Sequence, residues 1–278
     1  MLKKIGFSIV IIFALIGFSF TAIYFVVRFG LTNTEGIIDQ QSVAFIKGGI
    51  QDVNQDKSAT DTTNHHAWNK TNEWNIIESA LSNDLDVINK AASDSGVSSR
   101  IIVSQLVVEQ LRLFFTERAA FKKWFEPLKI LGSQTQFSWG VMGIKEETAI
   151  QIENNLKDPT SPFYLGKDFE NILDFETSDI KQERFERMTD QHDHYYSYLY
   201  AGLFIKQIIT QWQNAGFDIS NKPAIISTIY NLGFSKSNPK ADPKSGGALI
   251  EIDGIKYSFG SLGGEFYNSD EMIVEFPR

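Results

Sequence analysis

The chain has 278 residues, a formal net charge of -8 and no cysteine. The negative charge argues against nucleic acid as the main partner, and the missing thiols exclude disulfides, cysteine zinc sites and a cysteine nucleophile. Hydrophobic residues make up 42% of the chain and charged residues 22%, which predicts a mostly globular protein.

An uncharged and mostly apolar run, residues 5–27, is the first feature along the chain. Lys3 and Lys4 precede it and Arg28 ends it. The run is longer than the core of a secretory signal, about 7–15 residues, and suits a membrane-spanning helix of about 20 residues. Because the small residues late in the run make a poor cleavage site, we expect residues 1–30 to be an uncleaved membrane anchor. The lysines favour a cytoplasmic N-terminus, so the body would lie outside the cytoplasm.

Residues 31–70 are predicted to form a spacer, because the stretch 51–70 is strongly polar. From Thr71 the apolar residues recur at helical spacing as far as Ile88, and the pattern breaks at residues 94–96. Ser98 and Ser99 can cap a following helix. Residues 71–278 therefore form the predicted body.

More helices are expected further along. Their expected ranges are 119–131, 145–156, 195–214 and 223–230. The segment 195–214 is apolar nearly all round, which predicts a buried central helix. Residues 248–259 predict a β-hairpin with Asp253-Gly254 as its two-residue turn. The fold class is thus mainly α (α+β), with a small C-terminal β-hairpin.

Glu109 is the strongest candidate for chemistry. On a helix it shares a mostly apolar face with Ile102, Leu106 and Leu113. Burial of a carboxyl favours its neutral form and so raises its pKa, which a general acid needs near neutral pH. The alternative is a structural glutamate at the helix margin, paired with Arg112 or Arg118.

Other motifs favour structural interpretations. Glu146 and Glu147 at the start of a predicted helix complement its dipole. His192 and His194 are predicted to lie at a solvated helix start, because alternate residues on a helix diverge and no third metal ligand is evident. We therefore expect no metal site.

Three sequence pieces then occur in a specific order. Glu109 lies on an apolar helix, the loop SWGVMGI (residues 138–144) follows about 30 residues later, and Tyr230-Asn231-x-Gly233 follows a long helix. In this order the chain resembles the lytic transglycosylase family of the soluble-transglycosylase and goose-type lysozyme kind, over roughly residues 98–234. That family has a catalytic Glu, an S-x-G-x-M-Q-I loop and an A-Y-N-x-G motif. The chain departs from it at Gln110, where the family has Ser or Thr, and at Gly143, where the family has Gln.

The resemblance implies a lysozyme-like fold and an enzyme that cleaves peptidoglycan glycan strands without a cofactor. Glu109 would protonate the glycosidic oxygen between N-acetylmuramic acid (MurNAc) and N-acetylglucosamine (GlcNAc). It would then act as base for attack by the muramyl 6-hydroxyl, leaving a 1,6-anhydro product. The protein would sit in the inner membrane with its body on the periplasmic face. The implied substrate-binding residues are Ser138, Gly140 and Met142 on the cleft floor, and Tyr230 and Asn231, which would hydrogen-bond the acid and the sugar.

Two alternatives remain open at this point. The first is a non-catalytic, glycan-binding or scaffold protein of the same fold, which Gln110 and Gly143 favour. The second is an unrelated helical envelope protein that interacts with partners of unknown identity. In that case no cleft would be found at Glu109, and Tyr230 and Asn231 would lie far from Ser138.

Overall fold

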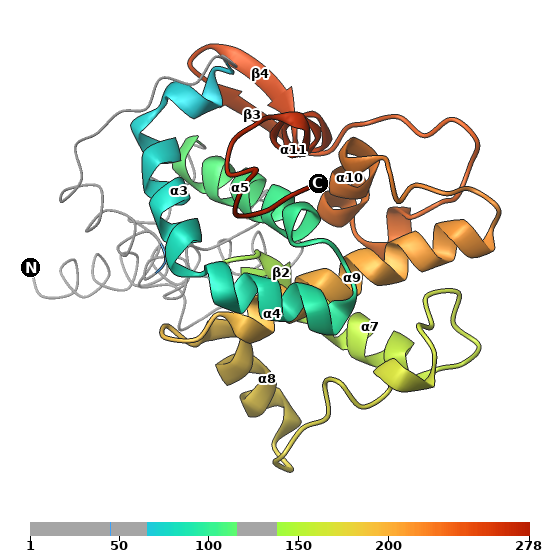
Figure 1. The fold of residues 1–278 in the computed structure, drawn as a ribbon. Helices are drawn as coiled ribbons and strands as arrows, with labels where there is room; N and C mark the ends of the chain where they lie inside the picture. The colour runs from blue at the N-terminus through green and yellow to red at the C-terminus, as the bar shows by residue number, and fades with distance from the viewer. Residues whose placement is uncertain (1–44, 46–65, 116–137) are drawn as a thin grey trace, which may run out of the picture.

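The computed structural model describes residues 45, 66–115 and 138–278 (Figure 1). This part of the chain is mainly helical, with two small two-stranded antiparallel sheets, so the predicted mainly α class with a small β element is confirmed. The predicted anchor at residues 1–30 and the helix expected at 119–131 lie outside the described residues. In the described ranges, no helix has both the length and the apolar character needed to cross a bilayer.

The elements follow one another in the order shown by colour in Figure 1. The helices are α3 (Asn72–Asn83), α4 (Leu85–Ser95), α5 (Ser99–Phe115), α7 (Glu146–Lys157), α8 (Ile180–Thr189), α9 (Tyr195–Asn214), α10 (Pro223–Leu232) and α11 (Phe259–Asn268). The strands are β1 (Ser138–Trp139), β2 (Ile144–Lys145), β3 (Leu249–Ile252) and β4 (Ile255–Ser258). Short 3-10 turns lie at Trp68–Lys70, Lys167–Phe169 and Phe234–Lys236.

Helices α5 and α9 form the centre of the described body. Every residue of α5 from Arg100 to Arg112 is buried. Helix α9 has the predicted bounds, and its residues from Ser197 to Ile205 are all buried, as its all-round apolar pattern predicted. Helices α3, α4, α7, α8, α10 and α11 pack around these two (Figure 1). Glu109 and the other candidate residues on α5 are therefore held on a central, buried helix.

The predicted helix after Thr71 is divided in two at Asp84. The carboxylate of Asp84 accepts a hydrogen bond from the Tyr198 hydroxyl and lies 2.5 Å from Nδ1 of His194. Both partners belong to the start of α9, so a tertiary contact sets this break. His194 is 8% exposed, so the prediction of a solvated histidine was wrong for His194. It is buried in contact with the Asp84 carboxylate, a partner that the local sequence did not reveal.

The end of the predicted spacer packs into the body. Trp68 is fully buried against Trp74 and Phe266, and its Nε1 donates to Glu265 at 3.0 Å. Asn69 donates to Glu271 at 2.8 Å. The packed body therefore includes residues that precede Thr71.

Helix α11 packs against α10 through glycines. A Cβ added at Gly260 would lie 2.0 Å from Oγ1 of Thr228 and 2.6 Å from the backbone oxygen of Ala224. A Cβ at Gly263 would lie 2.2 Å from Oγ of Ser227. Real contacts are never this short, so the two backbones approach as closely as they do because these positions have no side chain.

Replacing Gly260 by alanine should therefore destabilise the protein. In an open helix, Gly→Ala gains about 1 kcal/mol, but overpacking costs about 1–3 kcal/mol. The clash includes a backbone oxygen that cannot rotate away, so we expect a net loss of about 2 kcal/mol in the free energy of unfolding. Gly246→Ala is the control, because nothing lies within 4 Å of its added Cβ. Denaturant unfolding of both variants tests this, and equal stabilities would contradict it.

The C-terminal hairpin has the predicted turn. Ile252 pairs with Ile255, which leaves Asp253 and Gly254 as the two-residue connection. Their φ angles are +49° and +79°, the left-handed values that an Asp-Gly hairpin turn adopts. Strand β4 leads into α11, whose first turn is capped by Ser258.

Arg100 joins α5 to the C-terminal segment. Its guanidinium is fully buried and donates five hydrogen bonds, all to backbone oxygens. The acceptors are the oxygens of Phe266, Tyr267, Ser269, Glu271 and Phe276. Burial and the neighbouring Arg278 lower the pKa of Arg100 to about 10, so it stays charged at neutral pH.

Candidate functional site

A pocket of about 110 Å³ opens beside Glu109. Its walls come from five parts of the chain, which are helix α5, the segment after β1, helix α7, helix α9 and the end of α10. Its described lining consists of Glu109, Arg112, Gly143, Ile144, Lys145, Thr148, Phe204, Tyr230, Asn231, Leu232 and Gly233. Three segments that the sequence analysis singled out, far apart along the chain, therefore meet at one place.

The glycines of SWGVMGI form the turn between β1 and β2. Trp139 pairs with Ile144, and the amide of Gly143 donates to the Gly140 oxygen at 3.1 Å. Gly140 and Gly143 have φ angles of +70° and +63°, which side-chain-bearing residues rarely adopt. Both glycines are therefore explained by the turn itself.

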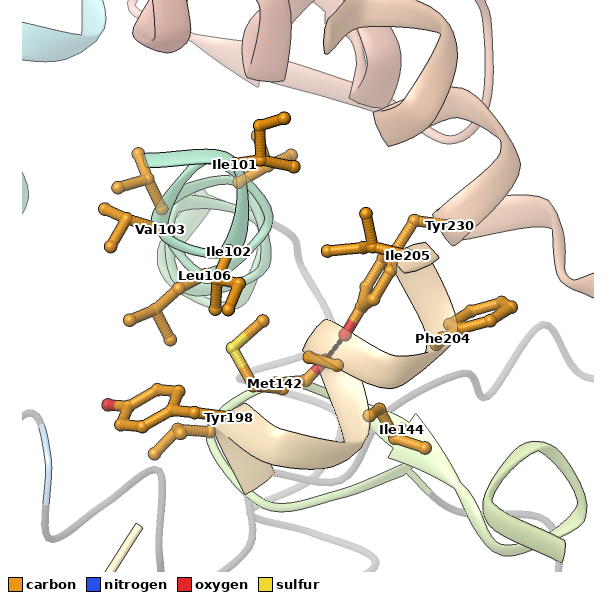
Figure 2. Close-up of a cluster of buried hydrophobic side chains, with 14 of the residues drawn as sticks. Ile101, Ile102, Val103, Leu106, Met142, Ile144, Tyr198, Phe204, Ile205 and Tyr230 are labelled. Atoms are coloured by element: carbon orange, nitrogen blue, oxygen red, sulfur yellow. Dashed lines mark hydrogen bonds between the residues drawn. The ribbon is translucent and has the colours of Figure 1, made fainter. Parts of the chain in front are cut away.

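Two buried side chains hold this turn in place. Nε2 of Gln110 donates to the Val141 oxygen at 2.8 Å, and the Tyr230 hydroxyl donates to the Met142 oxygen at 2.8 Å (Figure 2). Gln110 stands where the resembled family has Ser or Thr, and here it links α5 to the turn. Tyr230 links α10 to the same turn. The turn is thus fixed from two sides.

Gly143 also lies directly against the candidate acid. A Cβ added there would be 3.0 Å from both Cδ and Oε2 of Glu109. A side chain at this position would therefore press on the Glu109 carboxyl. Gly143 thus leaves room for the Glu109 carboxyl where it is observed.

Glu109 is buried and paired. It is 4% exposed, and Nε of Arg112 donates to its Oε2 at 3.0 Å, with a second bond from Nη2 to the same oxygen. Two sequence interpretations were open, a shielded general acid and a structural glutamate paired with an arginine. The site has features of both, because Glu109 is buried and is also paired with Arg112. A neighbouring cation favours the charged carboxylate, whereas burial favours the neutral acid.

Tyr230 is a neutral hydrogen-bond donor in this site. Burial, and next the charge of Glu109, raise the pKa of its hydroxyl well above the ordinary value. The hydroxyl therefore keeps its proton at any physiological pH. Its observed acceptor is the Met142 oxygen.

Asn231 connects the pocket to the C-terminal hairpin. Its Oδ1 accepts a hydrogen bond from the Ala248 amide at 2.8 Å. Gly247 is needed for this approach, because a Cβ there would lie 2.8 Å from the same oxygen. The C-terminal segment, which the resemblance did not cover, thus supports one wall of the pocket.

The structure brings some of the predicted site residues together and not others. Glu109, Tyr230 and Asn231 line the pocket, whereas Gly140 and Met142 do not. The Met142 side chain is fully buried and points toward α5 (Figure 2). Burying the apolar Met142 side chain in the core is favourable, whereas exposing it in the pocket would leave it in contact with water. The side chain of Ser138 lies outside the described part of the structure.

Several lining residues were missed by sequence reasoning. Lys145 carried no motif signal, and Arg112 was considered only as a partner of Glu109. Its i, i+3 spacing from Glu109 is the signal that indicates a shared helix face. Among the described residues, no group of three or more histidine, aspartate or glutamate side chains could hold a metal ion.

A partly buried ion pair lies outside the pocket lining. Arg184 donates to both carboxylate oxygens of Glu153, at 2.6 and 2.7 Å. Tyr200 donates to the same carboxylate at 2.7 Å. Burial, and next the charge of Glu153, raise the pKa of Tyr200. This pair links α7, α8 and α9, and it offers a structural comparison for Glu109 and Arg112.

Comparisons with protein-family models, with curated proteins and with solved structures find no match for this chain.

Proposed function

We propose that the protein is a membrane-anchored, lytic transglycosylase-like enzyme that cleaves the MurNAc–GlcNAc bond of peptidoglycan, with Glu109 as its general acid and base. In this proposal the body has a lysozyme-like fold and faces the periplasm, and residues 1–30 anchor it in the inner membrane.

One observation carries the proposal. Glu109, the glycine turn and the Tyr230-Asn231 motif line or border a single pocket, in the combination that the resemblance implies. The Tyr230 hydroxyl donates to the Met142 oxygen of the glycine turn. In an unrelated helical protein, the glycine turn and the Tyr230-Asn231 motif would be expected to lie apart. Glu109 is also shielded from solvent, which a proton-donating carboxyl needs.

A single carboxyl suffices for this chemistry. Ordinary glycosidases use two carboxyl groups, one as acid and one as nucleophile or base. In a lytic transglycosylase reaction the 6-hydroxyl of the muramyl residue attacks its own anomeric carbon. Glu109 is the one acidic residue among the described residues that line the pocket. The lining therefore suits a reaction in which the substrate supplies the nucleophile.

The second candidate function is glycan binding without cleavage. The observation that favours it is the ion pair of Glu109 with Arg112, which stabilises the charged carboxylate. A carboxylate that stays charged cannot protonate a glycosidic oxygen. A binding protein would use the same pocket and leave the glycan intact.

Product analysis separates these functions. The full-length protein, in detergent, would be incubated with purified peptidoglycan, and released fragments would be separated and weighed by mass spectrometry. We expect 1,6-anhydro-muropeptides. Hydrated reducing ends would indicate a hydrolase instead. Binding to peptidoglycan without any release would support the binding protein and reject the enzyme.

Replacing Gly143 by alanine should reduce the rate of cleavage at least tenfold. The new methyl group would push the Glu109 carboxyl out of position, and a displacement of about 1 Å can lower a rate about 100-fold. The control is Gly233→Ala, since Gly233 also lines the pocket and has a φ of +86°, but nothing lies within 4 Å of its added Cβ. Both variants carry backbone strain of about 1–3 kcal/mol. Equal cleavage by the two variants would contradict a role for the Gly143 contact.

A further inference from the structure

Helix α8 is a polar helix at the lower edge of the body in Figure 1. Five of its ten residues are charged. Of its apolar side chains, Phe185 and Met188 pack with the core, whereas Ile180 is 46% exposed. A helix with so few apolar contacts adds little to the core. The contacts that it does make therefore indicate what it supports.

Phe185 connects α8 to the glycine turn through Trp139. The two rings meet edge to face, with their centroids 5.4 Å apart and their planes at 86°, an arrangement that aromatic pairs prefer. Trp139 is 3% exposed, and its backbone pairs with Ile144. Ile144 follows Gly143, whose added Cβ would lie 3.0 Å from the Glu109 carboxyl. A chain of direct contacts thus leads from α8 to the candidate acid.

Arg184, the preceding residue of α8, lies at the other end of the turn. Its Nη1 is 3.9 Å from Oε1 of Glu146, and the two side chains are 8% and 4% exposed. Glu146 is the first residue of α7 and comes directly after β2. Two consecutive residues of α8 therefore lie against the segment before the turn and the segment after it. Contacts at both ends restrain the turn as a unit.

Helix α8 is itself fixed to the central helix α9. Met188 is fully buried, and its backbone oxygen accepts a hydrogen bond from Oγ of Ser197 at 3.2 Å. The Arg187 guanidinium lies over the Tyr196 ring, 4.6 Å from its centroid. Because α8 is held in this way, it can hold the turn at a set distance from the centre of the body.

We propose that Phe185 is a positioning residue, which holds the glycine turn against the Glu109 carboxyl from outside the pocket. Phe185 is not among the residues that line the pocket. Gln110 and Tyr230 bind backbone oxygens of the same turn from α5 and α10. Phe185 adds a third support, from α8. As a statement about catalysis, this inference rests on the proposed function, because it assigns Phe185 to the placement of the acid.

A turn that is held in place cannot move away when Gly143 gains a side chain. In the wild-type background, the methyl group of Gly143→Ala must displace the Glu109 carboxyl. Once Phe185 is shortened to alanine, the turn itself can move instead. The effect of Gly143→Ala should therefore be smaller in the Phe185→Ala background than in wild type.

A double-mutant cycle measured by denaturant unfolding tests this without reference to catalysis. The four full-length proteins are wild type, Gly143→Ala, Phe185→Ala and the double variant. The factor by which Gly143→Ala lowers the folding equilibrium constant should be at least about threefold smaller in the Phe185→Ala background. Phe217→Ala is the matched control, because Phe217 also packs partly buried against the core but does not line the pocket. Its effect and that of Gly143→Ala should combine independently to within about twofold.

Cleavage and binding of peptidoglycan give the second measurement. Phe185→Ala should lower the rate of muropeptide release about tenfold, because a displaced acid reacts slowly. The fraction of protein that sediments with peptidoglycan should stay within about twofold, since no lining residue is changed. Phe185→Leu keeps an apolar side chain and should restore most of the rate. Gly143→Ala should lower the rate by less than about threefold in the Phe185→Ala background, compared with at least tenfold in wild type.

Independent effects of Gly143→Ala and Phe185→Ala on unfolding would overturn the inference, as would a loss of binding equal to the loss of rate. Should Phe185→Ala fail to fold, the same cycle with Phe185→Leu decides, with a smaller coupling of the same sign expected. Coupled unfolding in a protein that releases no muropeptide would keep Phe185 as the support of the turn and reject the enzyme. Muropeptide release with independent effects on unfolding would do the reverse.

Discussion

Replacing Glu109 by glutamine should abolish the release of anhydro-muropeptides while the protein remains folded. Glutamine has nearly the same shape as glutamate but cannot donate a proton to the glycosidic oxygen. Loss of a general acid lowers rates by about 10²–10⁴-fold. Here the same group would also serve as base, so we expect the loss to reach the upper part of this range. Rates of product release from purified peptidoglycan would measure it.

The stability of Glu109→Gln must be considered with its activity, because the change breaks a buried ion pair. Removing one partner of such a pair costs about 3–5 kcal/mol. In this variant the amide oxygen can still accept a bond from Arg112, so we expect a smaller cost, about 1–3 kcal/mol. A folded but inactive variant is therefore the expected result.

Glu153→Gln is the matched control for this prediction. Glu153 is also largely enclosed and paired with an arginine, with its side chain 13% exposed, but it does not line the pocket. This variant should lose comparable stability and keep its cleavage rate within a few-fold. Similar inactivity in both variants would mean that the loss comes from the fold. Near-normal cleavage by Glu109→Gln would remove Glu109 from the mechanism.

Much of the helical architecture was predictable because local patterns agree with the tertiary structure. Segment 195–214 is apolar all round and forms the central helix α9 with those bounds. The Asp253-Gly254 turn places the C-terminal hairpin in the predicted register. Helix α7 begins at Glu146, one residue from its expected start. In each of these three cases, a single local sequence pattern was enough to predict the element that the structure shows.

Other parts depend on contacts between distant residues. The apolar spacing continues through Asp84, so the sequence predicted one helix where the structure has α3 and α4. The contacts of Asp84 with His194 and Tyr198 lie at this division, and they join residues more than 100 positions apart. Helix α11 contains three glycines, which disfavour helices in isolation. It forms because Gly260 and Gly263 allow close packing on α10. No local pattern predicts such an element.

The candidate site was partly predictable for the same reason. Glu109 could be singled out because a carboxyl on an apolar helix face is unusual. The resemblance supplied the glycine turn and Tyr230, and the structure places them together with Glu109. The inward direction of Met142 and the close approach of Gly143 to Glu109 depend on three-dimensional packing. A sequence motif alone does not distinguish a residue that lines a pocket from one that supports it.

Arg100 is the residue whose loss should destabilise the described body most. Its five hydrogen bonds join the start of α5 to the end of α11 and the C-terminal segment. These acceptors include carbonyl groups from the last turn of α11, where the regular helical hydrogen bonds end. A buried carbonyl left without a donor costs about 1–3 kcal/mol. Some of these oxygens have a second donor, since Arg278 also donates to Tyr267 and Ser269, and the amide and hydroxyl of Ser269 donate to Phe266.

Replacing Arg100 by methionine, which fills a similar volume without donors, should therefore lower the free energy of unfolding by about 4 kcal/mol. This is a large part of the total of about 5–15 kcal/mol that is usual for a folded domain. Arg278→Gln is the control, because Arg278 donates to the same segment from an exposed position and should cost less than about 1 kcal/mol. Arg100→Lys should fall between the two, since lysine has three donors for five acceptors. Denaturant unfolding of the full-length variants measures all three, and an Arg100→Met protein as stable as Arg278→Gln would show that the buried guanidinium does not hold the C-terminal segment in place.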